Sequence, residues 1–219
     1  MTVVKICGIT EKWQAVSAIE AGSDFIGIVF AASPRQVSIE CARDLVSAVR
    51  EVSINVKVVG VFVNMPVPAV NRCADICDLD YVQLSGEETW AYCYEVKRPL
   101  IKAVRVGKGQ ELETLCGELR YGKRILAPKE HIILLDSLVE GSYGGTGVAS
   151  DWDLFRGVAK RFPVIIAGGL KPENVAQAVE LVSPWGVDVS SGVESNGIKD
   201  RGKMVAFVNA ARKSDEGKV

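Results

Sequence analysis

Short runs of apolar and β-branched residues recur along the whole chain. Their starts lie about 26 residues apart, which leaves room for one helix and two loops between successive runs. Two runs, VKVVGVFV and PVIIAG, are almost continuously apolar, as is typical of parallel strands covered on both faces. The predicted strands are Val3 to Ile6, Phe25 to Phe30, Val56 to Val63, Tyr81 to Leu84, Leu100 to Val106, His131 to Leu135, Pro163 to Ala167 and Gly186 to Val189.

Between these runs the apolar positions change to the spacing of amphipathic helices. Two helix starts are also predicted. The segment Ser150 to Asp153 resembles a capping box with Asp in place of Glu, and Pro172 suits the first turn of a helix. The predicted buried faces are Trp13, Val16 and Ile19 in the first helix, Cys41, Leu45, Val46 and Val49 in the next, and Val175, Ala178, Val179 and Val182 near the end of the chain.

Eight such strand and helix units fit within the 219 residues, with no linker rich in proline, serine or charge. We therefore expect an α/β fold, a closed (β/α)8 TIM barrel, with residues 1–219 as a single catalytic domain. A doubly wound open sheet is the alternative, and it would usually carry a glycine fingerprint after its first strand. Here that place is occupied by Cys7-Gly8-Ile9-Thr10.

The charge balance argues against polyanionic partners. The chain has 26 Lys and Arg residues and 27 Asp and Glu residues, for a formal net charge of -1. Nucleic acids and anionic membranes attract clustered basic residues, so we expect a small-molecule substrate, no nucleic acid and no membrane. No apolar run approaches the roughly 20 residues of a membrane span, and the N-terminus has no signal-peptide pattern. These features predict a cytoplasmic protein. The sequence does not decide between a monomer and a homodimer.

The cysteine and histidine content predicts free thiols and no metal site. Six cysteines are few for this length, because a secreted disulfide scaffold would be shorter and denser in cysteine. With one histidine, His131, and no Cys-x-x-Cys pair, a zinc site would lack ligands at usable spacing.

Candidate chemistry lies at the carboxyl ends of the predicted strands, where (β/α)8 barrels place their catalytic groups. Glycines follow the seventh and eighth strands, and there backbone N–H groups and helix N-termini can bind an anion. We expect these loops to bind a substrate phosphate, although the same glycines could serve only to make tight turns. The candidate phosphate-binding residues are Gly168, Gly169, Ser190, Ser191 and Gly192.

Cys7 and Asp136, at the ends of the first and sixth strands, are candidates for a paired base and acid. An unperturbed thiol loses its proton near about pH 8.5, so Cys7 would need a cationic or donor-rich surrounding to act as a base. Asp136 would need burial to raise its pKa before it could donate a proton at neutral pH. From the residues alone, a purely structural buried thiol at Cys7 stays open.

Three other charged residues suggest a structural role. By strand alternation Lys5 shares the face of Cys7, and Asp188 shares the face of Ser190. Together with Lys102 of the fifth strand, they are expected to point into the barrel. An ion pair between Lys5 and Asp188, across the seam of the first and eighth strands, would satisfy two charges that cannot stay unpaired.

Ten short blocks occur in order along almost the whole chain. They are VKICGIT at 4–10, SPRQVS at 33–38, VGVFVN at 59–64, VQLSG at 82–86, IKAVRV at 101–106, LLDS at 134–137, GGTG at 144–147, AGGLKPENV at 167–175, GVDVSSGVE at 186–194 and GIKD at 197–200. In these blocks and in their order the chain resembles the phosphoribosylanthranilate isomerases, enzymes of the tryptophan pathway.

The resemblance implies a (β/α)8 barrel that converts N-(5-phosphoribosyl)anthranilate into 1-(2-carboxyphenylamino)-1-deoxyribulose 5-phosphate, an Amadori rearrangement without a cofactor. It assigns the general base to Cys7 of KICG and the general acid to Asp136 of LLDS. It further implies that Arg35 of SPR holds the anthranilate carboxylate and that Gly145 of GGTG belongs to the phosphate site. One departure is Ser85, which stands where many members of the family have histidine.

Two other functions stay open. The chain could be another barrel enzyme acting on sugar phosphates, such as an epimerase or an indole-glycerol-phosphate synthase, or a non-catalytic sugar-phosphate-binding protein. An epimerase would normally pair two acids and the synthase would use a lysine as its acid, whereas these strand ends offer Cys7 and Asp136. A binding protein would have no reason to keep both groups.

Overall fold

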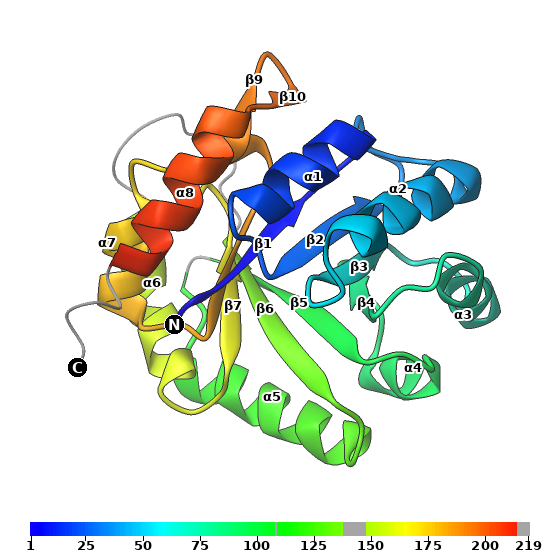
Figure 1. Ribbon diagram of the computed structural model, residues 1–219. Helices are drawn as coiled ribbons and strands as arrows, with labels where there is room; N and C mark the ends of the chain where they lie inside the picture. Colours follow the sequence, from blue (N-terminus) through cyan, green and yellow to red (C-terminus); the bar gives the residue numbers. More distant parts are fainter. Residues whose placement is uncertain (108, 138–147, 214–219) are drawn as a thin grey trace.

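The computed structural model describes residues 1–107, 109–137 and 148–213. Eight parallel strands close into a barrel in chain order, because β8 pairs with β1 as well as with β7 (Figure 1). This closure confirms the (β/α)8 barrel and rules out the open sheet. The strands are β1 Val3–Cys7, β2 Phe25–Val29, β3 Lys57–Phe62, β4 Tyr81–Leu84, β5 Leu100–Val106, β6 His131–Ser137, β7 Val164–Ala167 and β8 Gly186–Val189.

Helices surround the barrel, and a short hairpin follows β8 (Figure 1). None of the helices in the described ranges combines the length and apolar character needed to cross a bilayer. The helices are α1 Lys12–Glu20, α2 Ile39–Val52, α3 Val67–Ile76, α4 Trp90–Glu95, α5 Leu112–Leu126, α6 Val148–Ala159, α7 Val175–Val182 and α8 Arg201–Lys213, and the hairpin comprises the 3-10 turn η1 Ser191–Val193 with strands β9 Glu194–Ser195 and β10 Ile198–Lys199.

The inside of the barrel is a packed apolar core, as expected where strands alternate inward and outward side chains. Ile101 and Ala103 of β5 belong to this inner cluster, so Lys102 between them faces outward. The prediction that Lys102 points into the barrel is therefore wrong. The inner cluster consists of Phe25, Val59, Ile101, Ala103, Ile132, Leu134, Ile165 and Ala167.

Helical spacing predicted the buried face of α7 and, apart from the half-buried Cys41, that of α2, but not that of α1. The side chain of Trp13 is 44% exposed, and α1 instead buries Gln14, Ala15, Ser17 and Ala18. Gln14 Oε1 accepts a hydrogen bond from Thr10 N at 2.9 Å, which satisfies a polar group that would otherwise be costly to bury. The apolar pattern failed here because this side chain has a partner in the preceding loop.

Both predicted helix starts are also wrong. α6 begins at Val148, so Ser150 is a residue within the helix and does not precede its start. α7 begins at Val175, and Pro172 lies in the turn before it, where Asn174 Oδ1 accepts a hydrogen bond from Lys171 N at 2.8 Å.

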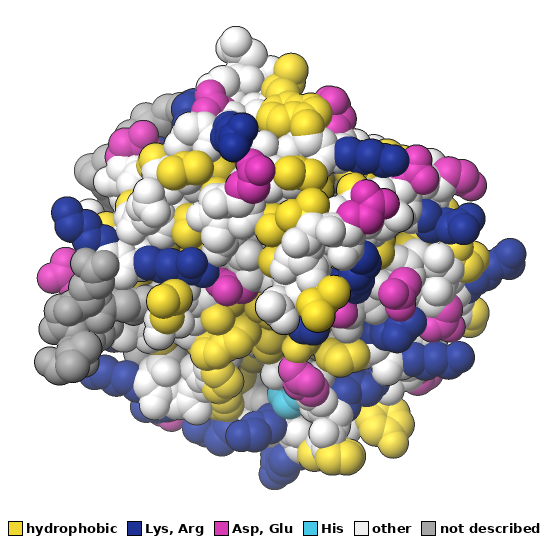
Figure 2. Space-filling model, viewed as in Figure 1, with side chains coloured by type: hydrophobic (Ala, Val, Ile, Leu, Met, Phe, Trp, Pro, Cys, Tyr) yellow, Lys and Arg dark blue, Asp and Glu magenta, His cyan; other side chains and the backbone are white. Residues whose placement is uncertain are grey.

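Lysine, arginine and acidic side chains are interspersed over the face shown in Figure 2, with small apolar patches between them. No large basic surface lies on that face, which agrees with the nearly neutral net charge of the chain.

Candidate active site

A cavity of about 210 Å³ lies at the carboxyl ends of β6, β7 and β8. It brings Asp136 together with all the predicted phosphate-binding residues that follow β7 and β8. Gly145, also predicted to bind phosphate, lies outside the described residues. The cavity is lined by Asp136, Ala167, Gly168, Gly169, Leu170, Asp188, Val189, Ser190, Ser191 and Gly192.

The glycines in these loops satisfy two different steric requirements. Gly168 and Gly169 have φ angles of 93° and 66°, a left-handed region that L side chains rarely adopt. A Cβ on Gly168 would also lie 2.9 Å from Asp136 Oδ1. Gly192 packs against the other loop so closely that a Cβ would overlap the carbonyl oxygen of Leu170. The backbones of the two loops therefore lie in direct contact, and the loop after β7 also lies against the carboxyl of Asp136.

Asp136 lies near the end of β6, level with Arg105 of β5 and Ala167 of β7. Burial raises the pKa of its carboxyl above the usual value, and the negative charge of Asp188 raises it further, while Arg105 acts in the opposite direction. This shift favours the protonated acid, the form that can donate a proton.

Cys7 ends β1 and is a free thiol with only 7% of its surface exposed. The neighbouring strand makes room for it with Gly27, where a Cβ would lie 2.6 Å from Cys7 Sγ. Burial raises the pKa of this thiol, Lys5 lowers it and Asp188 raises it, with a net increase. Cationic groups are present beside the thiol, as a base requires, but burial outweighs them.

Lys5 and Asp188 form the predicted ion pair. Lys5 Nζ donates to Asp188 Oδ1 at 2.9 Å, and the side chain of Lys5 is fully buried. The two residues are direct partners in the register between β1 and β8. Burial alone would lower the pKa of Lys5, but the charges of Asp188 and Cys7 raise it, so this ammonium stays protonated.

Arg35, in the loop after β2, is fixed by a carboxylate that sequence reasoning missed. Its Nε donates to Glu194 Oε1 at 2.7 Å and its Nη2 donates to Glu194 Oε2 at 2.6 Å. A Cβ on Gly8 would overlap the Arg35 side chain and lie 2.9 Å from Ser190 Oγ, so Arg35 passes beside the end of β1 and the phosphate loop.

Lys199 ties the same carboxylate to the phosphate loop. Its buried Nζ pairs with Glu194 Oε1 and donates to Ser190 O at 3.1 Å. Burial acts to raise the pKa of Glu194, but the hydrogen bonds from Arg35 and Lys199 outweigh it and hold that pKa below the usual value. Both residues belong to blocks that carried the resemblance, GVDVSSGVE and GIKD, and that was the only signal for them.

Ser85 follows β4 at the barrel mouth and accepts a hydrogen bond from Gln83 Nε2 at 3.0 Å. Gln83 is buried, and its Oε1 has no hydrogen-bond partner among the described residues. Gln83 is one of the polar residues at the strand ends where the sequence places the candidate chemistry, and its side chain lies beside Ser85 there.

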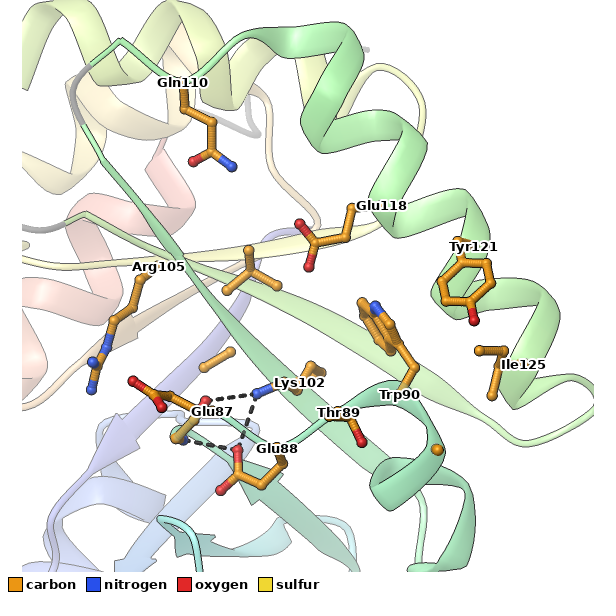
Figure 3. A pocket seen from close by; sticks show the side chains of 14 residues that line it. Glu87, Glu88, Thr89, Trp90, Lys102, Arg105, Gln110, Glu118, Tyr121 and Ile125 are labelled. Carbon is orange, nitrogen blue, oxygen red and sulfur yellow. Dashed lines mark hydrogen bonds and ion pairs between the residues drawn. The ribbon is translucent and has the colours of Figure 1, made fainter.

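A larger cavity of about 660 Å³ lies outside the barrel, between the loop after β4, β5 and α5 (Figure 3). Lys102 lines it and pairs with Glu88 at 3.1 Å, a contact drawn as a dashed line in Figure 3. None of the predicted catalytic or phosphate-binding residues lines this cavity. It is therefore separate from the candidate active site.

Comparisons with known proteins support the same interpretation. Residues 4–210 match the family described as N-(5'phosphoribosyl)anthranilate (PRA) isomerase. A relative from Dehalococcoides mccartyi, named N-(5'-phosphoribosyl)anthranilate isomerase, is 40% identical over 219 residues, covering 100% of both chains.

Two solved structures share the fold and a third or more of the sequence. Phosphoribosyl anthranilate isomerase from Thermotoga maritima has a TM-score of 0.83 at 37% identity, covering 97% of this chain and 100% of that chain. The second is a phosphoribosyl anthranilate isomerase in complex with reduced 1-(o-carboxyphenylamino)-1-deoxyribulose 5-phosphate, with a TM-score of 0.80 at 35% identity and the same coverage. The chain therefore belongs to the N-(5'-phosphoribosyl)anthranilate isomerase family.

Proposed function

We propose that this chain converts N-(5-phosphoribosyl)anthranilate into 1-(2-carboxyphenylamino)-1-deoxyribulose 5-phosphate, an isomerisation in tryptophan biosynthesis. The observation that carries this proposal is the cavity in which Asp136, with its raised pKa, borders two glycine loops. An acid beside an anion-binding cradle suits a phosphorylated sugar whose ring must be protonated to open. Family membership supports the same substrate.

The substrate phosphate binds between the loops that follow β7 and β8. Gly168 and Gly169 turn the first loop, and Ser190, Ser191 and Gly192 form the second. Backbone N–H groups at such turns point toward an anion, and the absence of side chains lets the phosphate approach closely. Lys199, hydrogen-bonded to Ser190 O, adds a positive charge behind the second loop.

Asp136 acts as the general acid. It donates its proton to the furanose ring oxygen, the bond between that oxygen and C1 breaks, and the anilino nitrogen supplies the electron pair that forms a protonated Schiff base. Burial and the charge of Asp188 raise the pKa of this carboxyl and so favour the protonated form that this step uses.

Cys7 acts as the general base. Its thiolate removes the proton from C2 of the opened sugar, and the electron pair moves to the Schiff base to give an enolamine. Tautomerisation of the enolamine then gives the ketose. The substrate exchanges only protons with the enzyme, and electrons are redistributed within the substrate between C1 and C2. The reaction therefore needs no redox carrier. Positioned acid and base groups each contribute about a hundred- to ten-thousandfold to the rate.

Arg35 binds the anthranilate carboxylate. Its guanidinium has five N–H donors. Glu194 accepts from two of them, the Nε–H and one N–H of Nη2. The opposite edge, between Nη1 and Nη2, keeps two parallel donors that match a second carboxylate. Glu194 thus orients Arg35 while leaving that edge available for the substrate.

The proposal is tested by following the loss of fluorescence of phosphoribosylanthranilate on adding the purified protein. We expect turnover of this small-molecule substrate. We also propose that the protein acts in the cytoplasm, as a monomer or a homodimer. Asp136→Asn should keep phosphate affinity but lower turnover by at least about a hundredfold. Absence of turnover in the wild type, or near wild-type turnover in the variant, would contradict the proposed function or the role of Asp136, respectively.

A further inference from the structure

The ion pair of Lys5 and Asp188 lies between the two groups that the proposed mechanism uses. Lys5 precedes Cys7 by two residues on the inward face of β1 and is fully buried. Asp188 borders the cavity that contains Asp136. The ammonium is thus on the side of the base, and the carboxylate faces the acid.

A buried thiol keeps its proton unless a positive charge stabilises the thiolate. Four charged groups act on Cys7: Lys5 on its own strand, Asp188 on β8, Lys199 on β10 and Arg35 after β2. Arg35 and Lys199 both pair with Glu194, so this carboxylate offsets part of their charge.

Lys5 is the cation with the strongest effect on the thiol. Its positive charge lowers the pKa of Cys7 and so favours the thiolate. Asp188 takes one of its three N–H donors at 2.9 Å, and Lys5 lies on the same inward face of β1 as Cys7, two residues before it.

We propose that Lys5 is a positioning residue for the isomerisation: its buried ammonium, on the same inward face of β1, favours the thiolate of Cys7 against the burial that opposes it, and Asp188 keeps that ammonium charged and in place. The inference rests on the proposed role of Cys7 as the base. In the proton transfer, the C2 proton moves to Cys7 Sγ while Lys5 remains protonated throughout. Asp188 also favours the protonated form of Asp136, so the single pair supports opposite protonation states in the acid and the base.

The first measurement is a titration of the Cys7 thiol. The ultraviolet absorbance of the thiolate is followed against pH as the difference between the parent protein and its Cys7→Ser counterpart, in the wild type and in Lys5→Met. Loss of a neighbouring opposite charge should raise the thiol pKa by about one unit or more. Below that pKa the thiolate population falls about tenfold for each unit.

The second measurement is the pH dependence of kcat/KM. Lys5→Met should lose about tenfold or more near neutral pH, and the deficit should shrink as the pH rises past the thiol pKa of the variant, because both proteins then hold the thiolate. A purely structural defect would persist at all pH values.

A matched control is available in the same barrel. Lys102 and Glu88 form a second buried ion pair, at 3.1 Å, that faces outward and lies apart from the candidate active site. Lys102→Met removes a buried lysine from its carboxylate in the same way, so it should lose stability without changing the Cys7 titration or the shape of the pH profile.

Should Lys5→Met fail to fold, Lys5→Met/Asp188→Leu removes both charges and avoids an unpaired buried carboxylate. The thiol pKa should still rise, because the effect of Lys5 on Cys7 exceeds that of Asp188. An unchanged Cys7 titration overturns the inference, as does a loss of kcat/KM that is independent of pH. If the wild type shows no isomerase activity, the proposed function fails, and the thiol titration still decides whether Lys5 stabilises the thiolate.

Discussion

Gly192 offers the sharpest test of the phosphate site, because a single methyl group would separate its two loops. A Cβ at this position would overlap the carbonyl oxygen of Leu170 and lie 3.0 Å from its carbonyl carbon. These are backbone atoms of the loop after β7, so no side-chain rotation relieves the contact. In Gly192→Ala, carbon and oxygen must return to about 3.3 Å or more, which displaces one loop by on the order of 1 Å.

The displacement is large compared with the tolerance of a hydrogen bond. Charge-assisted N–H···O bonds are about 2.7–2.9 Å long, and a contact near 3.6 Å no longer counts as one. A phosphate held by both loops would therefore lose its bonds to one of them. Each such bond contributes about 1.5–3 kcal/mol, so losing two weakens phosphate binding by about a hundredfold or more. The overpacking itself should cost about 1–3 kcal/mol of folding stability.

Calorimetric titration with inorganic phosphate and with ribose 5-phosphate measures the affinity, and a thermal scan measures the stability. Gly122→Ala is the control, because Gly122 lies on α5 away from the cavity and its Cβ would lie 2.5 Å from the Trp90 ring of α4, which is also an overpacked contact. It should lower the melting temperature but leave both affinities unchanged. Gly192→Ala protein that is folded and binds phosphate within about threefold of the wild type would refute this placement of the phosphate.

Three further outcomes are expected. Burial and Asp188 raise the pKa of Asp136, so its ionisation opposes folding above about pH 3.9; Asp136→Asn should melt higher than the wild type at neutral pH, and the difference should vanish in scans below that pH. Arg35→Lys should raise KM for phosphoribosylanthranilate about tenfold while leaving the affinity for ribose 5-phosphate unchanged. An equal loss of affinity for both ligands would indicate that Arg35 binds the phosphate and not the anthranilate carboxylate. Cys7→Ser should lower turnover by at least about a hundredfold with a stability change under about 1.5 kcal/mol, and retained turnover would require another base.

The strands could be predicted from the sequence because burial on both faces leaves a continuous apolar signal. The ends of β4, β5 and β8 match the predicted ones, and the largest error at any strand end is two residues, at Ser137 of β6. Because the strand ends were predicted to within two residues, Cys7, Asp136 and the glycine loops could also be placed at the same end of the barrel, the carboxyl end of the strands. The ion pair of Lys5 and Asp188 followed from strand alternation together with the adjacency of the first and last strands in a closed barrel.

Contacts made by loops could not be predicted in this way. Arg35 and Glu194 are 159 residues apart, and neither lies in a periodic segment. The prediction for Lys102 was wrong because alternation shows which residues of a strand share a face, but not which of the two faces points into the barrel. In β5 the packing of Ile101 and Ala103 in the inner cluster decides this. Gln14 was missed because a hydrogen bond to Thr10, and not hydrophobicity, decides its burial.

The requirement for a thiolate and a neutral carboxyl in one mouth has a kinetic consequence. Ordinary thiol and carboxyl pKa values are about 8.5 and 3.9, so a state with Cys7 ionised and Asp136 protonated is a minority at every pH. The rate should then rise with pH up to the pKa of Asp136, stay level, and fall above the pKa of Cys7. Burial raises both pKa values, which helps the acid and opposes the base. For each pKa unit by which Lys5 lowers the pKa of Cys7, the rate in the pH-independent region rises about tenfold. A charge that contacts no substrate atom therefore sets the maximum rate in the pH profile.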